Sequence, residues 1–304
     1  MKLVAVVGPT GVGKSSLALS LAREFNGEIV NADSRQVYRY MDIGTAKPTA
    51  ENRAEVPHHL LDVVNPDQEF NQAIHRQLAD TAIADITARG KLPLLVGGSG
   101  LYVWAVLEGW EAPPVPPDQA FRGSLALKAE REGDEALFAM LEAADPVAAR
   151  HIDRRNRRRV IRALEVCQSG EQFSRLRRKS APAYDVLIIG LTMERNRLYW
   201  TIDRRVERMV EAGLIDEVRR LREMGYGTEL PAMSGIGYRQ FSNYLDGQVN
   251  REQAVSETKA ESRRFARRQF AWFKVTDARI KWFEADSMPL DSANEELTRH
   301  LSLN

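Results

Sequence analysis

Short apolar runs recur along the 304-residue chain and alternate with stretches of helical periodicity. The runs that are rich in β-branched residues predict buried strands at residues 3–7, 28–32, 60–64, 92–96 and 186–191. Stretches such as residues 71–89 between them have the composition of helices. Strands that alternate with helices are typical of a parallel sheet covered by helices. The pattern therefore predicts an α/β fold with a mostly parallel sheet flanked by helices.

The pattern changes between residues 113 and 182. Residues 113–117 read PPVPP, which fits neither a helix nor a central strand, and the following residues are helical in composition. A buried strand returns at residues 184–189, and beyond residue 194 the chain is mainly helical. We expect a first part of the core at residues 1–112, a helical insertion domain at 113–182, and a continuation of the core at 183–304 with a basic helix near 252–275.

Composition and charge narrow the class of protein. The apolar content of 43% and the net charge of +1 exclude a disordered chain, and no run of about 18 apolar residues is present to cross a membrane. A single cysteine, Cys167, excludes a disulfide framework and a cysteine-rich zinc site. We therefore expect a cytoplasmic protein that does not enter a membrane.

The small net charge hides a local excess of cations. Residues 150–179 hold eleven Arg or Lys and three Asp or Glu, a local charge of +8, which leaves −7 for the rest of the chain. Binding of clustered Arg and Lys to phosphates releases counterions and is therefore favourable, so this segment is a candidate surface for a polyanion. A solvated basic face is the alternative interpretation.

The clearest chemical motif follows the first predicted strand. Residues 8–15 read GPTGVGKS and fit G-x-x-x-x-G-K-[ST] at every defined position. In this motif backbone amides and a helix N-terminus surround phosphate groups, the lysine adds positive charge, and the Ser15 hydroxyl suits Mg²⁺. The residues expected to bind a diphosphate or triphosphate are Gly8, Thr10, Gly11, Val12, Gly13, Lys14 and Ser15, with Ser15 as the metal ligand.

Polar residues also follow two other predicted strands. Asp33 comes directly after the second strand, and ligands of an open parallel sheet lie beyond the carboxyl ends of its strands. A carboxylate there could hold a metal, act as a base, or cap the next helix. Residues 97–100 read GGSG, a turn in which backbone can approach a ligand and Ser99 offers a hydroxyl. The pair His58 and His59 has no third ligand nearby and is interpreted as structural.

Two segments predict helices with arginines on one face and apolar side chains on the other. The first carries Arg154, Arg155, Arg158, Arg159 and Arg162 opposite an apolar face that includes Val160, Ile161 and Cys167. The second carries Arg263, Arg264, Arg267 and Arg268 opposite Phe265, Trp272 and Phe273. Two such helices beside a phosphate loop favour RNA or DNA as a partner.

The residues resemble one family from end to end, the tRNA dimethylallyltransferases, also called tRNA isopentenyltransferases. The matching blocks are residues 8–15, 33–48 (DSRQVYRYMDIGTAKP), 57–66, 89–102, 158–166, 205–218, 235–240 and 262–273. The block at 33–48 is far more specific than the phosphate loop. The resemblance implies a P-loop NTPase-like fold with a tRNA-binding insertion. It also implies transfer of a dimethylallyl group, with Mg²⁺, from dimethylallyl diphosphate to the N6 amine of the adenine immediately 3′ of the anticodon.

The resemblance also implies roles for single residues. Asp33 matches the general base of the family, Ser99 stands where the family usually has threonine, and Arg205 matches the arginine that neutralises the diphosphate. These three are the expected catalytic residues. The residues expected to contact tRNA, through its anticodon stem-loop, are Asp33, Ser34, Arg35, Gln36, Ser99, Arg122, Arg158, Arg159, Val160, Ile161, Arg162, Gly235, Gly237, Tyr238, Arg263, Arg264, Arg267 and Arg268. A monomer is expected.

Two other functions use the same phosphate loop. A small-molecule kinase would place Asp33 as the base for a hydroxyl and close the arginine cluster over ATP. A non-catalytic RNA-binding protein would keep the loop as a relic, which intact Lys14, Ser15 and Asp33 argue against. A small-molecule kinase has no use for a second basic helix, so the segment near residues 263–268 favours transfer to RNA.

Overall fold

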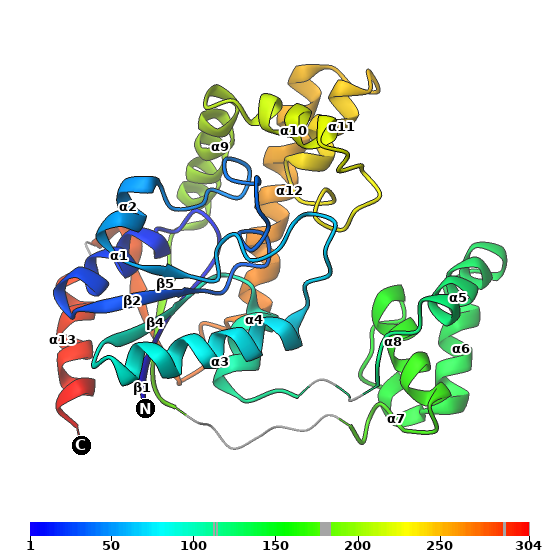
Figure 1. The fold of residues 1–304 in the computed structure, drawn as a ribbon, viewed down its shortest axis with the longest axis horizontal. Helices are drawn as coiled ribbons and strands as arrows, with labels where there is room; N and C mark the ends of the chain where they lie inside the picture. The colour runs from blue at the N-terminus through cyan, green and yellow to red at the C-terminus, as the bar shows by residue number, and fades with distance from the viewer. Residues whose placement is uncertain (112, 114, 177–183, 288–289, 304) are drawn as a thin grey trace. The chain divides into compact units, whose positions relative to one another are not determined.

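The structure is a computed structural model that describes residues 1–111, 113, 115–176, 184–287 and 290–303. The chain divides into two compact units (Figure 1). The sheet unit comprises residues 1–107 and 182–304, and the insertion unit comprises residues 108–181. The sequence predicted boundaries at 112/113 and 182/183. Residue 114 of the proline-rich segment and residues 177–183, which include three of the predicted basic residues, lie outside the described residues.

The described residues of the sheet unit form a six-stranded sheet in the order β3-β2-β4-β1-β5-β6, with every neighbouring pair parallel. The strands are β1 (Lys2–Val7), β2 (Gly27–Asn31), β3 (His58–His59), β4 (Leu92–Val96), β5 (Asp185–Thr192) and β6 (Ile280–Glu284). In the centre of the sheet, Val4 lies opposite Leu94 on β4 and Leu187 on β5. The predicted α/β fold with a parallel sheet is confirmed.

The strand predicted at residues 60–64 is wrong. β3 ends before this run, and Leu60 and Asp62 have φ angles of 63° and 55°. These angles lie in the left-handed region, which an extended strand cannot contain. The N–H groups of Val63 and Val64 instead donate to the carbonyl of Val37, at 2.8 and 3.1 Å. The run is apolar because it packs against the loop that follows β2.

Two groups of helices cover the sheet. Helix α1 (Lys14–Glu24) and helix α13 (Leu290–Ser302) share a core with Val4 and Val6 of β1. Helix α3 (Gln72–Ala88) and helix α4 (Gly100–Leu107) pack together, and α3 lies against β2 and β4. Helix α3 matches the helix predicted at 71–89. It begins after Asn71, whose side chain caps it by accepting from the N–H groups of residues 73 and 74.

The remaining helices of the sheet unit cluster beyond the ends of the strands, at the top of Figure 1. They are α9 (Arg195–Glu211), α10 (Leu214–Glu223), α11 (Tyr238–Leu245) and α12 (Arg251–Trp272). A short α2 (Ala50–Glu55) and a 3₁₀ turn (Ala285–Ser287) complete the unit. Leu214 and Val218 of α10 pack with Phe241 of α11 and with Val37 from the loop after β2. This core places α9 to α12 at the end of the sheet where parallel strands bind ligands.

The insertion unit is built from four described helices: α5 (Gln119–Glu132), α6 (Asp134–Ala144), α7 (Pro146–Ala149) and α8 (Arg157–Gln168). Its core includes Leu125, Leu141, Val160 and Leu164. Helix α8 begins after its N-cap Asn156, so the predicted helical arc of arginines loses residues 154 and 155, which precede the helix. Among the described helices of both units, none is long and apolar enough to cross a membrane.

Candidate active site

The phosphate loop joins β1 to α1. Gly13 is the N-cap of α1 with φ at 102°, a left-handed conformation that glycine adopts without strain. Gly8 packs so closely on β5 that a Cβ atom would lie 2.4 Å from the carbonyl oxygen of Leu191. Both glycines are therefore required by the backbone path. The loop delivers the N-terminus of α1, with its unpaired amides, to the candidate phosphate site.

The ammonium group of Lys14 is buried beside another cation, which disfavours its charged form. Its Nζ donates a hydrogen bond to the carbonyl of Pro9 at 2.8 Å. Burial, with a contribution from the positive charge of Arg205, lowers the pKa of Lys14 to about 7, although Asp33 acts in the opposite direction. The residue as a whole keeps some exposed surface, so the burial concerns its ammonium group. An anion bound beside Nζ would restore the positive charge.

Arg205 reaches the phosphate loop from α9. Its Nη1 donates to the Thr10 hydroxyl at 3.0 Å, and burial lowers the pKa of its guanidinium while Asp33 opposes that shift. A small cavity of about 80 Å³ brings Arg205 together with Thr10, Lys14, Ser15 and Asp33. The structure thus gathers, around one cavity, residues that the sequence placed near position 10, at position 33 and at position 205.

Gln269 of α12 is a part of this site that sequence reasoning missed. Its side chain is 4% exposed and is bonded at both ends: Oε1 accepts from the Thr10 N–H at 2.7 Å, and Nε2 donates to the Gly98 carbonyl at 2.8 Å. It therefore joins α12 to the phosphate loop and to the turn after β4. Because the Thr10 N–H already donates to Gln269, only the hydroxyl of Thr10 is left to donate to a phosphate.

Asp33 begins a turn and does not cap a helix. Its Oδ1 accepts from the Arg35 N–H at 2.8 Å, and residues 34–37 form turns, with α2 the next described helix in the chain. The cap interpretation is therefore wrong, while the base and metal interpretations stay open. The N–H of the next residue, Ser34, donates to Ser99 Oγ at 3.0 Å. Ser99 thus holds the Asp33 loop against the turn after β4.

A larger cavity of about 370 Å³ also has Asp33 in its lining. Its walls come from the loop after β2, from α9, from residues 234–239 and from α12. Apolar side chains form much of this lining: Ile202, Val206, Met209, Leu214, Ile236 and Phe265. Asp33, Thr10 and Arg205 line both cavities. A ligand in the larger cavity would therefore meet, at Asp33, a ligand held by the phosphate loop.

Several residues expected to contact tRNA are used to build these walls. Arg35 Nη1 donates to the carbonyls of Pro231 and Ala232, at 2.7 and 3.3 Å. Gln36 Nε2 donates to the carbonyls of residues 45 and 46. Gly235 and Gly237 line the larger cavity. These contacts position the segments around the cavity and leave the base-facing role of Arg35 and Gln36 a prediction.

Tyr238 is only 1% exposed, and its hydroxyl donates to Glu217 Oε1 at 2.6 Å. Burial and the Glu217 carboxylate both raise the pKa of Tyr238 well above its usual value. Glu217 also accepts from the backbone N–H groups of residues 42, 43 and 44. The hydroxyl of Tyr238 is therefore bonded inside the protein, while the residue lines the larger cavity, and its expected contact with tRNA stays a prediction.

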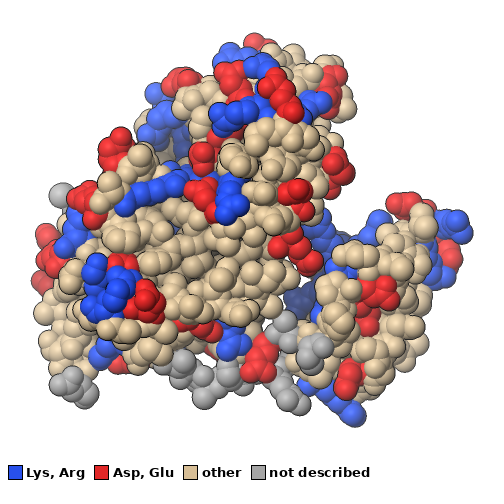
Figure 2. Space-filling model, in the orientation of Figure 1, with Lys and Arg blue, Asp and Glu red and all other residues tan. Residues whose placement is uncertain are grey.

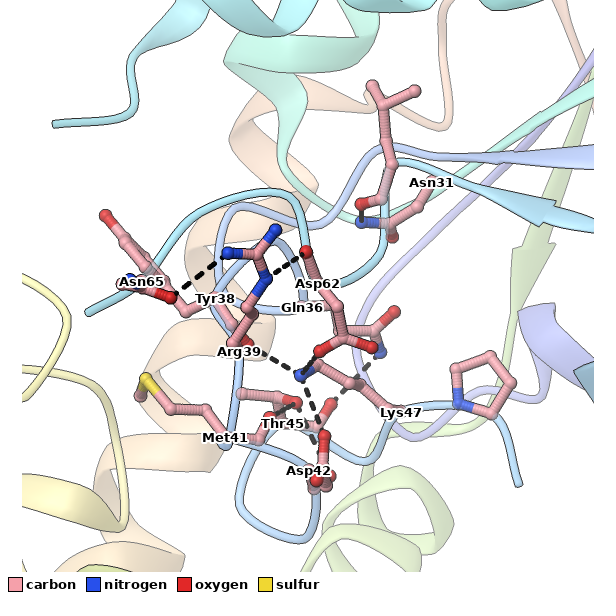
Figure 3. A network of polar contacts seen from close by, with 12 residues as sticks. Asn31, Gln36, Tyr38, Arg39, Met41, Asp42, Thr45, Lys47, Asp62 and Asn65 are labelled. Atoms are coloured by element: carbon pink, nitrogen blue, oxygen red, sulfur yellow. Dashed lines mark hydrogen bonds and ion pairs between the residues drawn. The ribbon is translucent and has the colours of Figure 1, made fainter. Parts of the chain in front are cut away.

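The specific block at residues 33–48 is held by a network of polar contacts (Figure 3). Lys47 lies at its centre with a side chain only 1% exposed, where its Nζ bonds the Tyr38 carbonyl, Asp42 Oδ1 and Asp62 Oδ1 at 2.6 to 2.8 Å. Arg53 completes the network through Asp62 Oδ2 at 2.9 Å. These contacts hold the end of the block, while Asp33 stands at its start.

Two arginines of the insertion unit that are expected to contact tRNA are half-buried and paired with an acid. Arg122 and Arg162 both pair with Glu165, whose side chain is 2% exposed. Arg162 Nη2 also donates to the Val115 carbonyl at 2.7 Å, so it fixes the proline-rich segment. Val160 is 1% exposed within the core. The expected contact of Val160 with RNA is therefore wrong, because its side chain is buried. Arg122 and Arg162 keep 30% and 24% of their side chains exposed, and their contact with tRNA stays a prediction.

The other arginines differ in what they contact. Among the insertion residues, Arg158 is exposed, while Arg159 and Ile161 are half-buried. On α12, Arg263 pairs with Asp203 at 2.7 Å and Arg264 pairs with Glu261. Arg267 is exposed, and Arg268 lies over the Phe265 ring at 5.9 Å and lines the larger cavity. Figure 2 shows acidic and basic side chains interspersed over the face it draws.

The residues present suit a magnesium ion only in part. The Ser15 hydroxyl and the Asp33 carboxylate line the same small cavity, and both are oxygen ligands of the kind Mg²⁺ prefers. The described residues contain no group of three His, Cys, Asp or Glu side chains that could hold a metal by themselves. An ion here would therefore take most of its ligands from phosphate oxygens and water, as Mg²⁺ commonly does.

Comparisons with known proteins agree on one family. The model of the IPP transferase family matches residues 36–276, and that of the isopentenyl transferase family matches residues 1–62. A tRNA dimethylallyltransferase of Roseiflexus castenholzii is 55% identical over 273 residues, covering 90% of this chain and 89% of the relative.

Solved structures resemble the whole chain. The tRNA isopentenylpyrophosphate transferase of Bacillus halodurans is 42% identical with a TM-score of 0.73, covering 98% of this chain and 96% of that one. A eukaryotic dimethylallyltransferase, captured acting on tRNA, is 26% identical with a TM-score of 0.82, covering 98% of this chain and 78% of that one. With these matches over most of its length, the chain belongs to the tRNA dimethylallyltransferase family of prenyl transferases.

Proposed function

We propose that this enzyme transfers a dimethylallyl group from dimethylallyl diphosphate to the N6 amine of the adenine immediately 3′ of the anticodon. The observation that carries the proposal is the meeting of two cavities at Asp33. The smaller cavity has the phosphate loop and two cations and suits a diphosphate. The larger one has both apolar and polar side chains in its lining and suits a base that has left its stack.

The chemistry explains these residue types. The N6 lone pair of adenine is delocalised into the ring, so the amine is a poor nucleophile. It needs a base that removes its proton as the new bond forms, and the Asp33 carboxylate lies where both cavities meet. The N6–carbon bond forms while the bond between the allylic carbon and the diphosphate oxygen breaks. The proton passes to Asp33 and the diphosphate leaves.

The leaving diphosphate gathers negative charge as it departs. The amides of the phosphate loop, Lys14 and Arg205 are fixed in place before the reaction, so they stabilise that charge without reorganising. Mg²⁺, held through Ser15 and the phosphates, would supply further positive charge to the leaving group. The loop holds a departing diphosphate, so no phosphoryl group needs to move.

We further propose that the anticodon stem-loop of tRNA is bound by exposed arginines of both units. Arg158 of α8 and Arg267 of α12 are exposed and free to contact phosphates, and Arg268 stands at the mouth of the larger cavity. The monomeric state and the cytoplasmic location of the enzyme stay predictions.

One experiment tests the proposal against the kinase alternative. The protein is incubated with labelled dimethylallyl diphosphate, Mg²⁺ and bulk tRNA, with and without ATP. We expect label in RNA without ATP, located at the adenine 3′ of the anticodon after nuclease digestion. Loss of the terminal phosphate of ATP in step with product, or a strict need for ATP, would replace this proposal with the kinase. Omission of Mg²⁺ with a chelator tests the metal and should abolish or strongly slow the transfer.

A further inference from the structure

The side chain of Asn31, the last residue of β2, makes two hydrogen bonds with the backbone of Asp33. Its Oδ1 accepts from the Asp33 N–H at 3.0 Å, and its Nδ2 donates to the Asp33 carbonyl at 3.2 Å. The residue is 4% exposed, so these bonds lie away from water. Neither bond touches the Asp33 carboxylate. The Asn31 amide therefore controls where the Asp33 backbone sits and not what its side chain contacts.

The same amide also holds a second loop. Nδ2 donates to the carbonyl of Leu60 at 3.1 Å, in the loop that follows β3. Leu60 has φ at 63°, an unfavourable angle for a residue with a branched side chain, and such a conformation persists only where its surroundings impose it. The Asn31 side chain thus bonds both the start of the 33–48 block, at Asp33, and the loop after β3, at Leu60.

The backbone carbonyl of Asn31 is itself bonded to a buried histidine. His75 Nε2 donates to the Asn31 carbonyl at 2.9 Å, and the His75 ring is fully buried and stacked on Tyr102 with centroids 4.4 Å apart. Burial lowers the pKa of His75, which favours the neutral ring with its proton on Nε2. Tyr102 belongs to α4, the helix that begins one residue after Ser99. The backbone of Asn31, from which its amide extends, is therefore held by His75.

We propose that Asn31 is a positioning residue of the transfer reaction: it directs the Asp33 carboxylate toward the acceptor amine by fixing the Asp33 backbone. The inference rests on the proposed function, in which Asp33 is the base. The two bonds with Asn31 fix the Asp33 backbone, and the Arg35 N–H fixes the carboxylate by donating to Oδ1. An error of about 1 Å in the position of a reacting group can cost about 100-fold in rate.

The test is a double-mutant cycle between positions 31 and 33. Single-turnover rates with saturating donor and tRNA are measured for Asn31→Ala, Asp33→Asn and the double variant. We expect Asn31→Ala to lower the rate about 10- to 100-fold, with the Kd of donor and of tRNA each changed less than about threefold. In the Asp33→Asn background the same change should cost less than about threefold, because the group it positions has lost its basicity.

A matched control separates positioning from general loss of stability. Asn294→Ala removes a hydrogen bond from α13 to Glu24 of α1 and should leave the rate unchanged. An equal loss in both Asp33 backgrounds, or a Kd that weakens as much as the rate, would overturn the proposal. If Asn31→Ala does not fold, Asn31→Ser, whose hydroxyl can still accept from the Asp33 N–H, takes its place in the cycle. If the Asp33→Asn variant reacted as fast as the wild type, Asp33 would not be the base, and the proposed function itself would have failed.

Discussion

The lowered pKa of Lys14 predicts that binding of the diphosphate depends on pH. In the free protein this pKa is about 7, chiefly because the ammonium group is buried and secondly because Arg205 is near. A bound diphosphate would favour the protonated form and raise the pKa again. Binding therefore takes up a proton whenever the free enzyme has lost it. The affinity should be highest below pH 7 and should fall as the pH rises above it.

The size of the effect follows from the pKa. If only the protonated enzyme binds, the observed Kd grows as one plus ten to the power of pH minus 7, so it is about 50-fold larger at pH 9 than at pH 7. That ratio corresponds to about 2 kcal/mol. At pH 8 about nine-tenths of Lys14 would be neutral in the free protein, so about 0.9 proton should be taken up on binding. The protons bound or released by the ligand itself are measured in the same buffers without protein and are subtracted from this count.

The assay is calorimetric titration with inorganic diphosphate and constant Mg²⁺ at pH 7, 8 and 9, in two buffers of different ionisation enthalpy. The difference between buffers counts the protons. Lys14→Met provides the control: it should bind weakly at every pH, with no slope and no proton uptake between pH 7.5 and 9. A flat Kd for the wild type over this range, or an equal slope in Lys14→Met, would refute the reasoning.

Three further predictions follow from the site. Asp33→Asn should lower the single-turnover rate about 10²- to 10⁴-fold, as expected for loss of a general base, with little change in tRNA affinity; a loss below about tenfold would exclude that role. Arg158→Ala should weaken tRNA binding and reduce the log–log salt slope by about one, whereas Arg299→Ala, an exposed and paired arginine of α13, should leave the slope unchanged. Gln269→Leu should leave the Thr10 N–H and the Gly98 carbonyl without their partner and weaken diphosphate binding about 10- to 100-fold, and unchanged binding would show that the loop holds its shape without this residue.

Much of the fold and the centre of the site could be predicted because both depend on local patterns. Strand ends in a parallel sheet meet at one edge, so Asp33 and Ser99 could be placed beside the phosphate loop before any coordinates were known. The phosphate loop needs glycines at set spacings, which a sequence displays directly. Arg205 was reached only through the resemblance, since nothing in the local pattern of α9 distinguishes it from its neighbouring arginines.

The parts that could not be predicted depend on partners distant in the sequence. Glu165 looks like an ordinary acid on a basic helix, yet it is buried and neutralises Arg122 and Arg162. Glu217 is likewise buried, where it accepts three backbone N–H groups from the loop at 42–44. Gln269 follows a run of arginines but faces the opposite side of its helix. A pattern of charges shows where cations are, not which of them are already paired.

The order of strands in the sheet has a consequence for how the enzyme is made on the ribosome. The two neighbours of β1 are β4 and β5, and the insertion unit separates them in the chain. At about 5–20 residues per second, the roughly 180 residues between β1 and β5 take about 10 to 40 seconds to synthesise, and one edge of β1 lacks its partner throughout. Gly8 packs on Leu191 of β5, so the phosphate loop reaches its final shape only after the insertion has emerged. A nascent chain can therefore fold its arginine-bearing insertion before it can hold a diphosphate.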